Sequence, residues 1–286
     1  MSDSAFKKSS KTSPQNNNSN KRKDKFRSLF VKLAFMLICL ISWEIVAANE
    51  MLGPNSRLIF PTLEDIGSAF IHNFIKGYAG SSLWIYIGNS LKLLFIGLFG
   101  GIALSFALSG LSIISRTFYE IYSLCVSIFD LLPGVALLPV VIAIFGVKPG
   151  VIVFLVIHAV IWPMSRNILD GFKAVPKIYV EAGKNIGLFG FSLLFGVYLP
   201  ASISYIVSGL KVGWARAWRG LISAEMIFGI ASCPGIGLYI NQMRTNLQNA
   251  EMYATLIVII LIGVLVQYGI LEPIETNTVK KWGMSR

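Results

Sequence analysis

The sequence predicts an all-α polytopic membrane protein. Of its 286 residues, 55% are hydrophobic and only 14% are charged, whereas soluble domains average roughly 25% charged residues. The mean hydropathy is +0.67. Several apolar segments reach the roughly 20 residues that a helix needs to cross a bilayer. This composition excludes a soluble enzyme, a nucleic-acid-binding protein and a disordered protein as descriptions of the whole chain.

The apolar segments predict six transmembrane helices. They cover about 29–48, 83–109, 118–145, 150–168, 199–228 and 252–272. We therefore expect residues 29–286 to form one membrane domain. Residues 1–28 are rich in Ser, Asn and Lys, and they predict a disordered basic tail in the cytoplasm. A weak contact of this tail with anionic membrane lipid is the alternative.

The distribution of positive charge predicts that both termini are cytoplasmic. With the N-terminus inside, the inner segments hold sixteen Lys and Arg residues and the outer loops hold four. Cytoplasmic loops of membrane proteins carry such an excess of positive charge. The intervening segment 62–77 has apolar residues at helical spacing, and it predicts an amphipathic helix lying on the outer surface.

The sequence contains no recognisable catalytic or metal-binding motif. Cys39, Cys125 and Cys233 lie far apart, without a CxxC pair or a Cys/His cluster, so we expect neither a disulfide framework nor a metal site. HExxH and GxSxG patterns are absent from the sequence, and Gly183-Lys184 is followed by Asn185 rather than by the Ser or Thr of a phosphate-binding loop. We therefore expect no enzyme activity and no catalytic residue.

Two of the six segments are irregular. Residues 118–145 would be about 42 Å long as a straight helix, which exceeds the bilayer core, and they contain Pro133-Gly134 and Pro139. Proline bends or breaks a helix, and either a kinked span or a broken span that lines a cavity fits this pattern. Segment 199–228 carries the charged residues Lys211, Arg216, Arg219 and Glu225, too many for a helix that faces lipid.

The loop 172–200 predicts a short docking helix on the cytoplasmic side. Pro176 can begin a helix, and Ile178, Ala182 and Ile186 then repeat at four-residue spacing to form one apolar face. Gly187 can end this helix in a left-handed conformation. A second short apolar helix follows, and it ends where the next span begins.

This loop resembles the EAA signature of the permeases of ATP-binding-cassette (ABC) importers. The matching residues are Glu181, Ala182, Gly183, Gly187, Val197, Leu199 and Pro200. The signature has Ala where this chain has Gly183, and Ile where it has Val197. Residues 129–146 and 209–228 further resemble the third and fifth spans of the nitrate/sulfonate/taurine-type subfamily, so the resemblance covers roughly residues 85–286.

The resemblance implies a transport subunit in a bacterial inner membrane. It implies that Glu181, Ala182, Gly183, Gly187, Leu199 and Pro200 couple the permease to ABC ATPase subunits, with Glu181 pairing with a basic residue of the ATPase. The ATPase would use the ATP and Mg²⁺, and the permease would bind no cofactor directly. An extracytoplasmic binding protein would deliver a small solute, anionic in this subfamily (nitrate, sulfonate, taurine or bicarbonate), to a permease homodimer.

Pro133, Gly134, Arg216, Arg219 and Glu225 are the candidate residues of the translocation pathway. Arg216 and Arg219 lie three residues apart and so share a helix face. They either attract an anion in a central cavity or serve structure, in which case one arginine pairs with Glu225 or Asp130. We interpret His158 as a hydrogen-bond donor inside the bundle rather than as a metal ligand.

A stand-alone secondary transporter or channel is the alternative function. Such a protein would not need a structured docking loop, and it commonly shows more spans or internal repeats.

Overall fold

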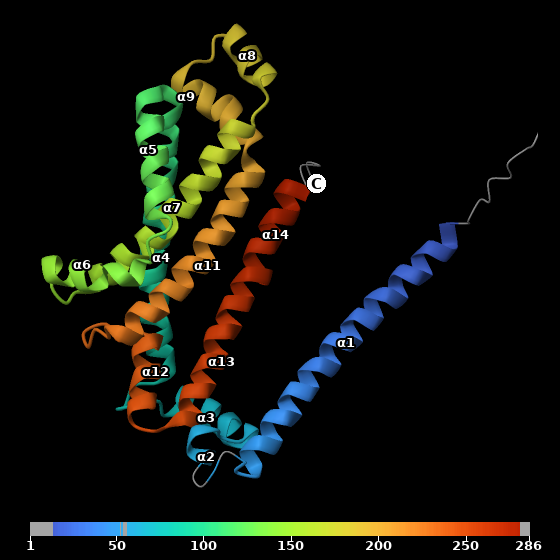
Figure 1. Ribbon diagram of the computed structural model, residues 1–286, viewed down its shortest axis with the longest axis vertical. Coiled ribbons are helices and arrows are strands. Elements are labelled where there is room, and N and C mark those ends of the chain that lie inside the picture. The colour runs from blue at the N-terminus through green and yellow to red at the C-terminus, as the bar shows by residue number, and fades with distance from the viewer. Residues whose placement is uncertain (1–13, 52, 54–55, 281–286) are drawn as a thin grey trace, which may run out of the picture. The chain divides into compact units, whose positions relative to one another are not determined.

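The computed structural model describes residues 14–51, 53 and 56–280, and the regular elements in these ranges are all helices (Figure 1). The chain forms two compact units, residues 1–63 and residues 64–286. An all-helical membrane fold was expected from the sequence, since helices satisfy their backbone hydrogen bonds internally in an apolar environment.

The first unit consists of the long helix α1 (Pro14–Ala48) and the short helix α2 (Ser56–Ile59). Helix α1 begins at Pro14, where proline is tolerated because it lies in the first turn. The helix therefore includes part of the segment that was predicted to be disordered. Residues 1–13 of the expected tail lie outside the described residues. Near the end of α1, the Trp43 Nε1–H donates to the Pro61 carbonyl oxygen at 3.0 Å and the Trp43 ring packs on Phe60.

The second unit contains the remaining helices. In chain order they are α3 (Leu63–Ile75, beginning at the unit boundary), α4 (Leu83–Ile114), α5 (Arg116–Phe129), a 3₁₀ turn (Gly134–Leu137), α6 (Leu138–Phe145), α7 (Pro149–Ala174), α8 (Lys177–Asn185), α9 (Gly190–Leu193), a π-helical turn (Leu194–Tyr198), α10 (Leu199–Ala201), α11 (Ile203–Ile227), α12 (Ile236–Thr245), α13 (Asn249–Val266) and α14 (Glu272–Glu275), the last lying between two further π-helical turns (Gln267–Leu271 and Thr276–Lys280).

Helix α7 packs closely against α4 through small residues. A Cβ atom on Gly97 of α4 would lie 2.5 Å from Val156 of α7, and one on Gly101 would lie 2.7 Å from Val160. Ser105 continues this four-residue spacing, and its hydroxyl donates to a backbone oxygen of α7 at 3.1 Å. Small residues at this spacing let helices approach closely in a membrane, where van der Waals contact and interhelical hydrogen bonds drive association.

Helix α11 packs against α7 in the same manner. A Cβ atom on Gly209 would lie 2.9 Å from Asn167 of α7, and Gly213 lies opposite Val160. Helix α7 is thereby held between α4 and α11, and its buried residues form the centre of the apolar core.

Different helices form the two ends of the second unit. Helices α8 and α9 lie at one end with the beginning of α5, whereas α3 and α12 lie at the other end (Figure 1). At the α3 end, Asn73 accepts a 2.7 Å hydrogen bond from the Tyr239 hydroxyl of α12 and donates to Thr255 of α13 at 3.2 Å. This buried network joins three helices, and it fixes the amphipathic helix that the sequence predicts near residues 62–77.

The described residues contain four helices long and apolar enough to cross a membrane, or up to six spans if each of two bent pairs counts as one. Helix α5 and the segment Gly134–Phe145 meet at 91°, and the segment Gly190–Ala201 meets α11 at 77°. At 1.5 Å per residue, the 14 residues of α5 are about 21 Å long, too short to cross the bilayer core. The predicted third segment is therefore broken rather than gently kinked.

Candidate functional site

The helix predicted in the cytoplasmic loop is present as α8, and its apolar face is exposed. Ile178 is 69% exposed and Ile186 is 77% exposed, and Ala182 lies between them on the same face. Glu181 is exposed beside this face and forms no side-chain hydrogen bond or ion pair with the described residues. An exposed apolar stripe next to a free carboxylate is a surface of the kind that docks in a partner's groove.

Gly187 ends α8 in the conformation that the sequence predicts. Its φ is +85°, in the left-handed region that glycine adopts without steric cost. The Gly187 N–H donates to the Lys184 carbonyl and the Leu188 N–H donates to the Gly183 carbonyl, both at 3.0 Å. This pair of hydrogen bonds is a Schellman motif, which satisfies the last carbonyl groups of the helix and turns the chain toward α9.

Gly183 holds α8 against the second half of the loop. It is buried, and a Cβ atom there would lie 2.8 Å from a methyl group of Val197 and 2.9 Å from one of Leu193. The two departures from the EAA signature, Gly183 and Val197, are thus in contact with each other. Leu199 packs against the apolar core, and Pro200 lies in the first turn of α10, leading into α11.

A cavity of about 230 Å³ lies at the break between α5 and α6. It brings together four of the predicted pathway residues, Pro133, Gly134, Arg216 and Arg219. Proline lacks an N–H and disfavours a helical conformation for the preceding residue, so α5 ends before Pro133 and a short 3₁₀ turn begins after it. Non-helical backbone at membrane depth is tolerated where it lines a cavity or is buried in protein.

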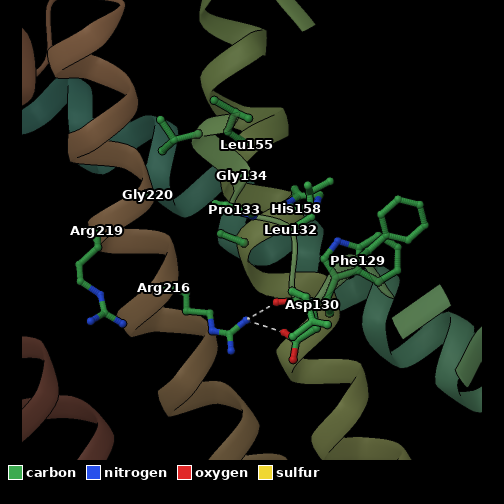
Figure 2. Close-up of a pocket in the computed structure, with 14 residues that line it drawn as sticks. Phe129, Asp130, Leu132, Pro133, Gly134, Leu155, His158, Arg216, Arg219 and Gly220 are labelled. Atoms are coloured by element: carbon green, nitrogen blue, oxygen red, sulfur yellow. Dashed lines mark hydrogen bonds and ion pairs between the residues drawn. The ribbon is translucent and has the colours of Figure 1, made fainter. Parts of the chain in front are cut away.

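Asp130 joins three helices at this cavity. Its side chain is 9% exposed, and it lies at the C-terminal end of α5, where the helix dipole disfavours a negative charge. The carboxylate accepts a 2.9 Å hydrogen bond from Arg166 Nε of α7. It also accepts a 2.5 Å hydrogen bond from Arg216 Nη1 of α11 (Figure 2). Two charge-assisted hydrogen bonds offset the desolvation of the carboxylate.

The structure separates Arg219 and Glu225 from this ion-pair cluster. Arg219 lines the same cavity, one turn along α11 from Arg216, and Figure 2 shows its guanidinium directed away from Asp130. Its Nε–H donates to the Ala215 carbonyl, and it forms no ion pair within the described ranges. Glu225 does not line the cavity: it is 1% exposed and accepts hydrogen bonds from Ser90 of α4 and from the Gly237 N–H of α12.

Three residues of this region were not singled out as pathway residues from the sequence. Arg166 was counted only as a positive charge near the cytoplasmic end of a span, and Trp162 was part of an apolar segment. His158 was expected to donate a hydrogen bond inside the bundle, whereas neither of its ring nitrogens has a hydrogen-bond partner among the described residues. No local pattern identifies them, because their partners lie on other helices. Among the residues that the structure describes, no group of three or more His, Cys, Asp or Glu side chains could hold a metal ion.

Several long apolar helices, a short helix with an exposed apolar face at one end and a charged cavity at a broken helix are typical of a membrane transport protein. Residues 97–272 match the family described as "binding-protein-dependent transport system inner membrane component". This match covers more than half of the chain, and the chain belongs to this family of ABC importer permeases. The resemblance seen in the sequence is confirmed.

Three permeases named here resemble this chain, two of them over most of its length. It is 23% identical over 244 residues to the taurine transport system permease protein of Escherichia coli, covering 85% of this chain and 87% of the relative. It is 25% identical over 229 residues to the nitrate import permease protein of Synechocystis, covering 80% and 82%. It is 26% identical over 118 residues to the bicarbonate transport system permease protein of Synechocystis, covering 41% of each.

Family membership settles the general role of the chain. It is a non-catalytic inner-membrane component without a cofactor of its own, and its transport system includes a binding protein and an ATPase. The alternative of a stand-alone transporter or channel is wrong, because transport by this family depends on a binding protein.

Proposed function

We propose that this permease imports a small solute carrying an oxyanion group and that α8 couples it to the ATPase. The relatives named above are permeases for taurine, nitrate and bicarbonate, and each of these solutes carries a sulfonate, nitrate or carbonate group. The cavity supports an anionic solute, since Arg216 and Arg219 line it and Asp130, the acidic residue in its lining, is already paired with Arg166 and Arg216.

The exposed apolar face of α8 is the observation that carries the coupling role. Ile178 and Ile186 remain exposed although α8 is fixed at both ends, by Pro176 and by the Schellman motif at Gly187. A rigid helix with an uncovered apolar face is suited to enter a cleft of the ATPase. Closure of the ATPase dimer would then displace α8 and, through Gly183, the loop that leads into α11.

The full assembly under this proposal is a permease homodimer with six spans in each subunit. Both termini and α8 face the cytoplasm, as the distribution of Lys and Arg predicts. In the second unit, α8 and the start of α5, which are expected inside, lie at one end, and α3 and α12, which are expected outside, lie at the other end, whereas α6 lies between the two ends (Figure 1).

Charge reversal at Glu181 tests the coupling role. A tagged permease is co-expressed with its ATPase and binding protein, and ATPase recovery and ATP-dependent uptake into proteoliposomes are measured. Glu181→Lys is expected to lose both ATPase recovery and uptake, while the permease still inserts into the membrane. Glu120→Lys is the matched control, because Glu120 is also exposed and belongs to α5 at the same end. Normal uptake by Glu181→Lys, or equal loss in the control, would overturn the assignment.

A further inference from the structure

We infer that the cavity at the α5–α6 break binds a small oxyanion through the imidazole of His158 and the indole N–H of Trp162. This inference rests on the proposed function, because that function supplies the class of solute. It adds two donor side chains that the pathway predicted from the sequence did not include.

His158 is a buried polar side chain that lacks a protein partner. It lies on α7, is 8% exposed and lines the cavity. Neither of its ring nitrogens has a hydrogen-bond partner among the described residues. Leaving a buried polar group unsatisfied is energetically unfavourable, so such groups almost always bind a water molecule or a ligand. Figure 2 shows His158 beside Pro133 and Gly134, at the interrupted part of the helix.

Trp162 adds a second unsatisfied group to the same cavity. It follows His158 by one helical turn, and the two rings make an edge-to-face contact with centroids 5.9 Å apart. Its ring stacks on Phe129 at 4.9 Å, which fixes its orientation. The indole Nε1–H is buried and has no acceptor within the described part of the chain. Because indole can only donate, the missing partner must be an acceptor.

The charges around the cavity favour an anion over a neutral acceptor. Arg166 and Arg216 bind the single carboxylate of Asp130, so this cluster carries one excess positive charge. Arg219 adds another positive charge to the wall of the cavity. An excess of positive charge in a cleft attracts an anion. The two bound guanidinium groups also screen the repulsion that Asp130 would exert on that anion.

The size of the cavity fits an oxyanion with some of its hydration water. Its volume is about 230 Å³, whereas a water molecule occupies roughly 30 Å³ in the liquid. Nitrate and sulfonate groups present only acceptor oxygens at the positions where the Trp162 N–H and one imidazole N–H need acceptors. An apolar ligand would leave all three ring nitrogens unsatisfied.

The two histidines of the chain allow a direct test. The full-length permease, labelled with ¹⁵N only in histidine, is reconstituted in lipid bilayers and studied by magic-angle-spinning NMR during titration with sodium nitrate. A His72→Gln variant assigns the two imidazole signals. We expect a saturable shift of the His158 signals and none for His72. Sodium methanesulfonate tests the sulfonate class, and sodium gluconate controls for ionic strength.

Trp162→Phe tests the role of the indole donor. Phenylalanine retains an aromatic ring beside Phe129 and removes the N–H, and loss of one hydrogen bond to a charged ligand should weaken nitrate binding about tenfold or more. Trp84→Phe is the matched control, since Trp84 is exposed near the start of α4; nitrate binding should stay unchanged. Thermal unfolding of each variant verifies that it is folded.

The possible outcomes separate this site from the proposed function. The absence of a saturable His158 shift with both anions in the wild-type protein would show a cavity that holds only water, and it would overturn the site even if α8 still recruits the ATPase. Undiminished nitrate binding by folded Trp162→Phe would also overturn it. Because the titration needs neither ATPase nor binding protein, a failure of coupling through Glu181 leaves its result unaffected.

Discussion

Asp130 forms an ion pair with Arg216, although 86 residues separate them in the sequence. This contact joins the end of α5 to the middle of α11 beside the cavity. It gives Arg216 a structural partner, whereas Arg219, three residues further along the same helix, has no ion pair within the described residues. We therefore expect Arg216 to serve structure and Arg219 to attract the anion.

The first prediction is that Arg216→Gln lowers stability and Arg219→Gln does not. Loss of Arg216 leaves Asp130, 9% exposed, with Arg166 as its remaining ion-pair partner, and we expect the free energy of unfolding to fall by about 1–3 kcal/mol. Arg219→Gln should retain the wild-type melting temperature and reduce uptake of the anionic solute. Thermal unfolding and uptake, measured on the same preparation of each variant, distinguish the structural role of Arg216 from the transport role of Arg219. Equal melting temperatures for both variants would contradict this division of roles.

The second prediction concerns Glu225, which the structure assigns to packing rather than to the cavity. Its carboxylate accepts a 2.8 Å hydrogen bond from Ser90 and a 3.0 Å hydrogen bond from the Gly237 N–H, in the first turn of α12. Glu225→Ala leaves these donors without an acceptor, at a cost of about 1–3 kcal/mol for each unsatisfied group. Glu225→Gln retains an acceptor and should lose less stability. The melting temperature should therefore fall in the order wild type, Glu225→Gln, Glu225→Ala. An unchanged melting temperature for Glu225→Ala would refute the role of Glu225 in packing.

The third prediction is that side-chain size at position 183 controls coupling. A Cβ atom at Gly183 would lie 2.8 Å from Val197, 2.9 Å from Leu193 and 3.7 Å from Leu188, in each case from a side-chain methyl group rather than from backbone, so the two nearest methyl groups must shift to admit it. Gly183→Ala should therefore retain ATPase recovery, helped by a helix propensity about 1 kcal/mol better than that of glycine. Gly183→Leu should separate α8 from the following turn and lose both ATPase recovery and uptake. Retention of both activities by Gly183→Leu would show that this contact is dispensable.

The fourth prediction concerns orientation in the membrane. Reporter domains fused at Ser10 and after Arg286 should report a cytoplasmic location, because the inner segments carry the excess of Lys and Arg. A reporter inserted at Leu247, between α12 and α13, should report the outer side and serves as the positive control. An external signal at either terminus would contradict the six-span arrangement.

The sequence by itself determined the class of the protein and the limits of α8. Hydrophobic composition, the positive charge of loops and the EAA spacing are properties of continuous segments, so they can be read without knowing the fold. The end of α8 at Gly187 is equally local, since a left-handed residue and two short-range hydrogen bonds produce it. The sequence also showed that Pro133-Gly134 disturbs a helix, but it left open whether the helix bends or breaks.

Only the tertiary structure decided which polar groups meet inside the membrane domain. Arg166 and Asp130 are 36 residues apart, and Ser90 and Glu225 are 135 residues apart, so no pattern in either segment names the partner. The same holds for His158 and Trp162, whose unsatisfied nitrogens become evident only once the neighbouring helices are in place. The physical reason is that hydrophobicity places a helix in the bilayer, whereas helix packing and desolvation determine which of its polar side chains find a partner.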